Sequence, residues 1–144
     1  YPGHELCGYG DIESELTTLP KLFPEFYAMR TKLRIGGRGL LPMTPKTLEE
    51  CWSNDQKHQR QTSFIGLDKY YPIGIYVYEN NVSIISLQEL FAVIIRNKET
   101  AQCVRLIFDF ALKGAESEDR VIRQEIEDIG IKKMVANSRK MFKS

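Results

Sequence analysis

Residues 71–114 read YPIGIYVYENNVSIISLQELFAVIIRNKETAQCVRLIFDFALKG, and this stretch decides the fold. Residues 73–78 alternate in the way that strands do, and a second β-rich run covers residues 82–87. Asn80 and Asn81 stand between the two runs, and Asn tolerates the positive φ that a two-residue hairpin turn requires. We therefore predict an antiparallel hairpin with its turn at these two asparagines.

This hairpin is predicted to lie inside a sheet. A turn at the two asparagines sets Val77 opposite Ile84. The same register sets Tyr76 opposite Ile85, so both faces of the ribbon carry large apolar side chains. A ribbon that is apolar on both faces is expected at a central position and not at an edge. A third run, over residues 91–95, is short, continuous and β-branched, and it predicts another strand.

A helix is predicted directly after the third strand. Asn97 is a residue type that caps helix N-termini, and Glu99 places a negative charge in the first turn. Gly114 is the residue type that most often follows the end of a helix. The stretch therefore predicts three strands followed by one helix that ends at Gly114.

The first half of the chain alternates predicted strands and helices. We first expect a strand at Leu6–Gly10, followed by a helix that Asp11 caps and Pro20 interrupts. A second helix is expected at Pro24–Lys32 and a second strand at Arg34–Leu41. A third helix is expected at Pro45–Asn54, with Thr44 as its cap. Four residues at helical spacing are expected to cover a sheet face, namely Leu22, Phe23, Phe26 and Tyr27. Residues 53–68 are polar and predict a surface loop or the tail of a helix.

Length and composition limit the classes of function. A chain of 144 residues with 42% hydrophobic residues is expected to form one globular domain. Since the sequence begins at Tyr1 and not at Met, we expect this domain to be excised from a longer protein. The net charge is +1, which argues against a dedicated nucleic-acid surface. No apolar run is long enough to span a membrane. The cysteines Cys7, Cys51 and Cys103 are odd in number and widely spaced, which predicts core thiols in a reducing cytoplasm and no zinc site.

Residues 115–144 are predicted to form a separate helical extension, so we expect an α/β domain over residues 1–114. Ser117 is expected to cap the extension, which is one bent helix or two helices. Its apolar stripe consists of Ile122, Ile126, Ile129, Met134 and Val135. The preceding domain looks complete without these side chains, so they should bury either back on the sheet or against a second copy of the chain. We expect the second copy, in a homodimer.

The central stretch also resembles a known family. The motifs are Ile-x-Ile-Tyr-x-Tyr at 73–78, Asn-Asn-Val-Ser-Ile-Ile-Ser at 80–86, and Asn-Lys-Glu-Thr-Ala at 97–101. Together with Pro42-Met43-Thr44-Pro45, they resemble the C-terminal effector domain of TrmB-like transcriptional regulators. These are winged-helix proteins whose effector domain is similar to a degenerate half of phospholipase D. The resemblance covers roughly residues 5–113 and does not extend to the rest of the chain.

The resemblance implies a fold and a function. The fold would be a mixed sheet with flanking helices, like a phospholipase D half domain. The function would be a cytoplasmic sensory and dimerisation module that binds a small molecule, such as a sugar, without a cofactor. DNA would be bound only through a winged-helix domain that this chain does not contain. Two other functions stay open, a remnant phosphodiesterase and a structural dimerisation module without a ligand.

The chemistry of phospholipase D is not expected in this chain. That chemistry uses His-x-Lys followed by four residues and Asp, with the His as nucleophile and the Lys on the phosphate. His4 is followed by Glu5-Leu6, and His58 is followed by Gln59-Arg60 with Ile65 at the Asp position. Neither histidine therefore has the partners that would activate it, and we predict no catalysis.

A ligand site is predicted from topology. In open α/β sheets, ligands collect beyond the carboxyl ends of the strands. The polar or aromatic residues expected there are Tyr9, Asp11, Thr44, Arg96 and Asn97, with Arg60 reaching in from a loop. The alternative is that Asp11, Thr44 and Asn97 serve only as helix caps.

Overall fold

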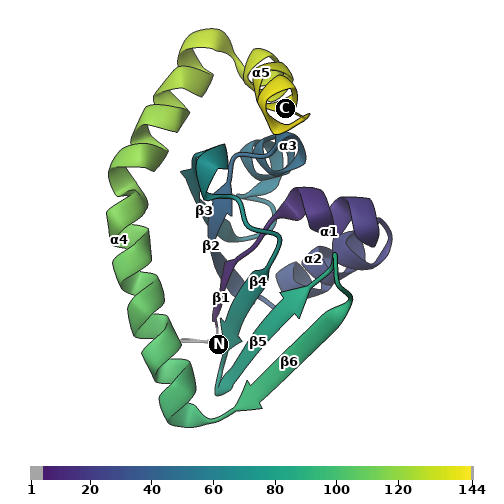
Figure 1. Ribbon diagram of the computed structural model, residues 1–144, viewed down its shortest axis with the longest axis vertical. Coiled ribbons are helices and arrows are strands. Elements are labelled where there is room, and N and C mark those ends of the chain that lie inside the picture. The colour runs from purple at the N-terminus through teal and green to yellow at the C-terminus, as the bar shows by residue number, and fades with distance from the viewer. Residues whose placement is uncertain (1–4, 144) are drawn as a thin grey trace.

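A six-stranded mixed sheet forms the centre of the computed structural model, which describes residues 5–143 (Figure 1). In sheet order the strands are β3 (Arg60–Ile65), β2 (Gly36–Pro42), β1 (Glu5–Tyr9), β4 (Gly74–Tyr78), β5 (Asn81–Ser86) and β6 (Phe91–Arg96). Strands β1, β2 and β3 are parallel, whereas β4, β5 and β6 follow as an antiparallel meander. The predicted mixed sheet with flanking helices is confirmed at this level.

Helices pack on both faces of the sheet. They are α1 (Ile12–Thr18), α2 (Leu22–Lys32), α3 (Pro45–Asn54), the single 3₁₀ turn η1 (Leu67–Lys69), α4 (Lys98–Ile129) and α5 (Ile131–Lys143). Figure 1 shows α4 along one side of the sheet and α1 and α2 on the other, with α5 beside α3. Side chains alternate along β4, so Tyr76 points toward α1 and Val77 packs against α4.

The hairpin forms with a turn one residue earlier than predicted. Val77 pairs with Val82 and not with Ile84, and the turn residues are Glu79 and Asn80, with Glu79 at φ 52°. The partner of Tyr76 is likewise two residues earlier than the predicted Ile85. Arg105 of α4 donates a hydrogen bond to the Glu79 carbonyl, a contact that stabilises the observed turn. A slip of two residues keeps every side chain on its expected face. Both strands are central, as predicted.

Strand β3 is an element that the sequence did not predict. Residues 60–65 were expected in a surface loop, but they pair in parallel with β2 and bury Phe64 and Ile65. The first four residues of this strand, Arg60 to Ser63, are all polar, so it lacks a long apolar run. Its outer edge is satisfied by α4, where Asp119 accepts from the Phe64 amide at 2.7 Å and Arg123 donates to the Thr62 carbonyl at 2.6 Å. These partners lie more than 50 residues away in sequence, beyond the reach of local patterns.

Helix α4 does not end at Gly114. It continues to Ile129, and the break comes at Gly130, which has a φ of +89° that favours glycine. Ser117 therefore lies inside the helix and caps nothing. The helix persists because both halves bury apolar side chains, with Phe108 before Gly114 and Ile122 after it. The predicted boundary at residue 114 falls in the middle of this helix.

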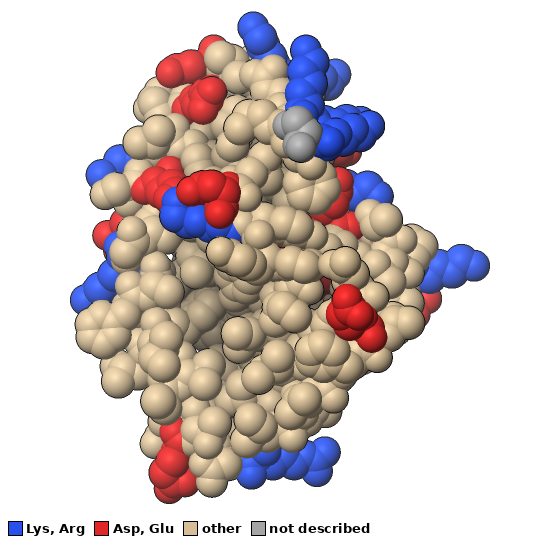
Figure 2. Space-filling model, viewed as in Figure 1, with Lys and Arg blue, Asp and Glu red and all other residues tan. Residues whose placement is uncertain are grey.

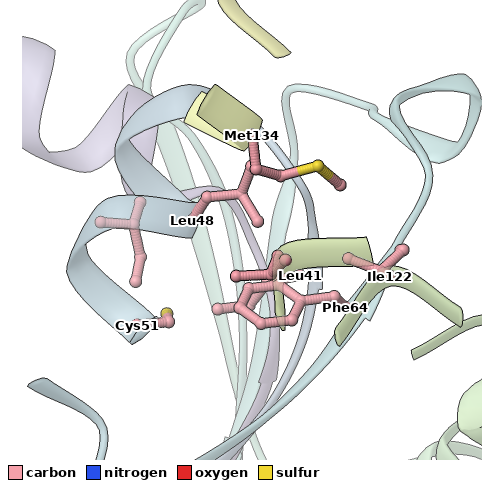
Figure 3. Packing of buried hydrophobic residues seen from close by; sticks show 8 residues of the cluster. Leu41, Leu48, Cys51, Phe64, Ile122 and Met134 are labelled. Carbon is pink, nitrogen blue, oxygen red and sulfur yellow. The ribbon is translucent and has the colours of Figure 1, made fainter. Parts of the chain in front are cut away.

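The C-terminal helices complete the core of their own chain. Figure 3 shows Ile122 and Met134 packed with Leu41, Leu48 and Phe64. Ile126 is 1% exposed, and Ile129 and Val135 pack against the same cluster. Each fully buried side chain of this kind contributes about 1.5–3 kcal/mol of burial free energy. The assignment of these five residues to a dimer interface is therefore wrong, because the sheet and α3 already cover them.

Helix α2 also presents a different face from the one predicted. Leu22 is 56% exposed and Phe26 is 37% exposed, so neither covers the sheet as expected. Tyr27 and Arg30 are the buried residues of this helix. Arg30 donates to the Ile35 carbonyl at 2.7 Å, and this bond allows a guanidinium to lie inward. Tyr27 is therefore buried as predicted, but the other inward position of the helix is taken by the charged Arg30 and not by Leu22 or Phe26.

Candidate functional site

Asp11 connects the carboxyl ends of β1 and β2. Its carboxylate accepts hydrogen bonds from the Glu13 and Ser14 amides, both at 3.1 Å, which confirms that it caps α1. It also accepts from the hydroxyls of Thr44 at 2.6 Å and Thr47 at 3.2 Å, at the start of α3. Thr44 occupies the predicted cap position but donates to Asp11 and makes no cap bond to its own helix. The two residues therefore meet as predicted, in a buried network that joins α1 to α3.

Tyr9 holds the loop that follows β3. Its hydroxyl donates to the Lys69 carbonyl at 2.7 Å and accepts from the Tyr71 amide at 3.0 Å. Burial raises the pKa of this phenol. The residue therefore positions the segment around Tyr70, next to the predicted site, and does not offer its hydroxyl to a ligand.

The other three predicted site residues lie at the opposite end of the sheet. Because β6 runs antiparallel to β1, its carboxyl end carries Arg96 and Asn97 away from Asp11. Asn97 caps α4 by accepting from the Thr100 amide at 2.8 Å, as the cap prediction stated. Arg60 begins β3, so it too lies at the amino end of the parallel strands. The prediction that these three residues join the others in one site is wrong.

Arg60 belongs to a buried polar cluster between α2 and α3. Its guanidinium pairs with Asp55 at 2.6 Å and lies 5.6 Å from the ring centre of Tyr27. His58 lies nearby, with Nδ1 3.2 Å from Glu50, and burial lowers the pKa of its imidazole. This cluster gives Arg60 a structural role at the amino end of the parallel strands. His4, the other histidine, lies outside the described residues.

A cleft of about 450 Å³ opens beside α1, next to the Asp11 network. It is lined by acidic, hydroxyl and amide side chains together with aromatic and aliphatic ones. The polar lining residues are Asp11, Glu13, Ser14, Glu15, Thr17, Thr18, Tyr70, Tyr76 and Gln88. The less polar lining residues are Phe23, Pro72, Ile73, Gly74, Ile85, Leu87 and Phe142. Such a mixture of apolar walls and a few polar groups is typical of small-molecule sites.

Glu15 and Tyr76 form the inner wall of the cleft. Tyr76 donates its phenol hydrogen to Glu15 at 2.8 Å, and Tyr27 donates to the other carboxylate oxygen. The Tyr76 ring lies against the end of β1 and the residue after it, and a Cβ at Gly10 would be 2.3 Å from the phenol oxygen. Burial raises the pKa of Glu15 although both phenols donate to it, and burial also raises the pKa of Tyr76.

The outer rim of the cleft contains Tyr70 and the end of the chain. The Tyr70 hydroxyl lies 3.1 Å from the Ser14 hydroxyl, and its ring meets Phe142 edge to face at 5.3 Å. Burial raises the pKa of both Tyr70 and Glu13. Helix α5, which the sequence placed in a separate extension, thus contributes an aromatic wall to the site through Phe142.

The sequence missed most of the residues that line this cleft. Glu15 lies in the predicted helix after Asp11 with nothing to mark it as a site residue, and Tyr76 looked like one of several large side chains in a strand. A usable signal was the set of glycines that face Tyr76, namely Gly8, Gly10 and Gly74, since glycines in strands often mark close approach of a large group. Phe142 had no local signal, because its position depends on the break at Gly130.

Comparisons with protein-family models, curated proteins and solved structures found no match to this chain. The resemblance to TrmB-like effector domains therefore stays an expectation drawn from the sequence.

Within the described residues, no cluster of His, Cys, Asp and Glu has the arrangement of a metal site. No helix among residues 5–143 is both long enough and apolar enough to cross a bilayer.

Proposed function

We propose that this chain is a non-catalytic effector domain that binds a small, uncharged, hydroxyl-rich molecule such as a sugar in the cleft beside α1. The observation that carries the proposal is the lining of that cleft. Carboxylate and amide groups from Glu13 and Gln88 stand close to aromatic side chains of Phe23, Tyr70 and Phe142. Sugars are bound by such combinations, because their hydroxyls pair with polar groups while their C–H faces pack on rings.

The charge of the cleft favours an uncharged ligand over a phosphorylated one. Three carboxylic acids line it, and none of the described lining residues is Lys or Arg. A phosphate group would therefore meet the negative charge of this lining, and no side chain among the described lining residues is a cation that could pair with it. This argument also weighs against the alternative of a remnant phosphodiesterase, and His58 does not line the cleft.

The proposed biological setting is a cytoplasmic transcription regulator similar to the TrmB-like proteins. The support is the sequence resemblance together with a mixed α/β fold that carries a cleft at one end of its sheet. Under this proposal, the signal is the occupancy of the cleft, and DNA is contacted by a winged-helix domain outside this chain. The alternative of a structural dimerisation module without a ligand makes no use of the cleft.

Isothermal titration calorimetry tests the proposal. Glucose, sucrose and glucose 6-phosphate serve as probes, and we expect saturable binding of an uncharged sugar that exceeds binding of the phosphorylated one. Gln88→Ala should weaken that binding by about 3–10-fold, the effect of losing one hydrogen bond. Gln56→Ala is the matched control, because Gln56 is exposed and does not line the cleft. Equal affinity in both variants, or tighter binding of glucose 6-phosphate, would contradict the proposal.

A further inference from the structure

Helix α4 carries two apolar stripes on different sides. One stripe faces the sheet and includes Ala101, Phe108, Ala115 and Ile122, all buried and spaced seven residues apart. The other stripe faces solvent and contains large side chains at Ile107, Phe110 and Val121, which are 62%, 69% and 67% exposed. A helix that needs only one buried face would carry polar residues on its outer face.

The exposed stripe has the spacing of a helix–helix seam. Its members recur at alternating intervals of four and three residues, the pattern that keeps one line of side chains facing a partner helix. They are Cys103, Ile107, Phe110, Gly114, Ser117 and Val121, and all of them are exposed. Along this seam two large residues, Ile107 and Phe110, come first, and two small residues, Gly114 and Ser117, follow them.

No contact within residues 5–143 accounts for Gly114. A Cβ at this position would meet no atom of the described residues within 4 Å, and the residue lies at an exposed position inside a helix, where glycine is unfavourable. Close approach of another backbone is a common reason for such a glycine. The empty space and the large exposed neighbours therefore both indicate a partner helix.

We propose that two copies of the chain associate through an antiparallel pair of α4 helices centred near Leu112. In this arrangement Phe110 of one copy packs over Gly114 of the other. The next layers place Ile107 against Ser117, and then Cys103 against Val121. Each layer thus joins a larger and a smaller residue. A parallel pair in register would instead place Phe110 against Phe110 and leave a gap at the two glycines.

The size and charge of the surface fit a second copy. Leu106 flanks the seam and is 58% exposed, like its three large neighbours in the stripe. These four side chains offer on the order of 400–500 Å² of apolar surface, more than half of the ~800 Å² per partner of a standard interface. Figure 2 shows few charged side chains over β4, β5, β6 and the first half of α4. An isologous contact also needs no second protein of different sequence.

Sedimentation velocity of the 144-residue chain and its variants tests this interface. We expect a reversible dimer, and we expect Gly114→Leu to weaken it by at least about tenfold because the added side chain blocks close approach. The open space around Gly114 should allow this variant to keep a native circular dichroism spectrum. Gln102→Leu, on the exposed surface of the same helix but outside the seam, should dimerise like the parent chain. A monomeric parent, or a Gly114→Leu variant with unchanged dimerisation, would overturn the proposal.

Disulfide trapping tests the antiparallel direction independently. Val121→Cys should form an intermolecular disulfide with Cys103 under mild oxidation, visible as a covalent dimer. The two positions are about 27 Å apart along one helix, so the bond cannot form within one chain. Cys7 and Cys51 are both buried and should not compete. Covalent dimers of the parent chain through Cys103 alone would point to parallel helices and overturn the antiparallel arrangement.

Discussion

Glu15 is the single residue on which the cleft wall depends most. Its carboxylate joins α1 to β4 through Tyr76 and to α2 through Tyr27, and it is 7% exposed. The charged groups that act on it are Asp11, which raises its pKa, and Arg60, which lowers it. Burial outweighs the hydrogen bonds from the two phenols, so the folded state favours the neutral acid.

This raised pKa predicts a pH dependence of stability. An acid whose pKa is higher in the folded state binds its proton more tightly there. Its contribution to stability is therefore full below the ordinary value of 4.5 and is lost as the pH rises above it. The unfolding free energy of the parent chain relative to Glu15→Gln should fall with pH in this window, by at most about 1.4 kcal/mol per pH unit.

Urea denaturation of the two proteins at several pH values measures this difference. Glu125→Gln serves as the control substitution, because Glu125 is exposed on α4. A difference between the parent and Glu15→Gln that stays constant with pH, or that grows in favour of the parent, would show that burial does not dominate at Glu15.

At the scale of elements, β3 shows how a polar strand can become part of a core. Asp119 and Arg123 on α4 occupy the hydrogen-bonding groups of its free edge, and Glu118 accepts from the Gly66 amide just beyond it. Arg123 also lies over the Phe64 ring, 4.9 Å from its centre. An edge covered in this way is protected from pairing with other chains.

Asp119→Ala should therefore destabilise the fold by about 1–3 kcal/mol, because the Phe64 amide loses its acceptor. Glu116→Ala is the control, since Glu116 is an exposed acid on the same helix. Native-state hydrogen exchange gives a local readout, in which the Phe64 amide should exchange faster in Asp119→Ala than in the control. Equal protection of this amide in both variants would show that Asp119 does not hold the edge of β3.

The elements that could be predicted from sequence depend on neighbouring residues. The hairpin, β6, the Asn97 cap and the bounds of α3 all follow from patterns within a few positions. The joint position of Asp11 and Thr44 could also be predicted, because both follow parallel strands. The placement of Arg96 could not, because it depends on how β4 pairs with β1, a contact between distant segments that makes β6 antiparallel to β1. β3 and the continuation of α4 depend on contacts between distant segments, which local propensity does not contain.

At the scale of the whole molecule, the C-terminal helices belong to both the core and the site. Met134 lies 3% exposed beside Leu48, and Phe142 reaches the cleft from the last turn of α5. The outer face of α4 is left free for a second copy. Association through α4 therefore does not compete for the residues that line the cleft, and one chain can use both surfaces at once.

The proposed site is tested most directly by two-dimensional ¹⁵N NMR of the chain during titration with sucrose. Amide shifts should concentrate at residues that line the cleft, such as Thr17, Gly74 and Gln88. Amides of Ser63 and Gln124, near the other side of the molecule where α4 crosses β3, should change little. Saturating shifts confined to the cleft are the expected result. Shifts that are absent at accessible concentrations, or that centre on residues outside the cleft, would contradict a ligand site beside α1.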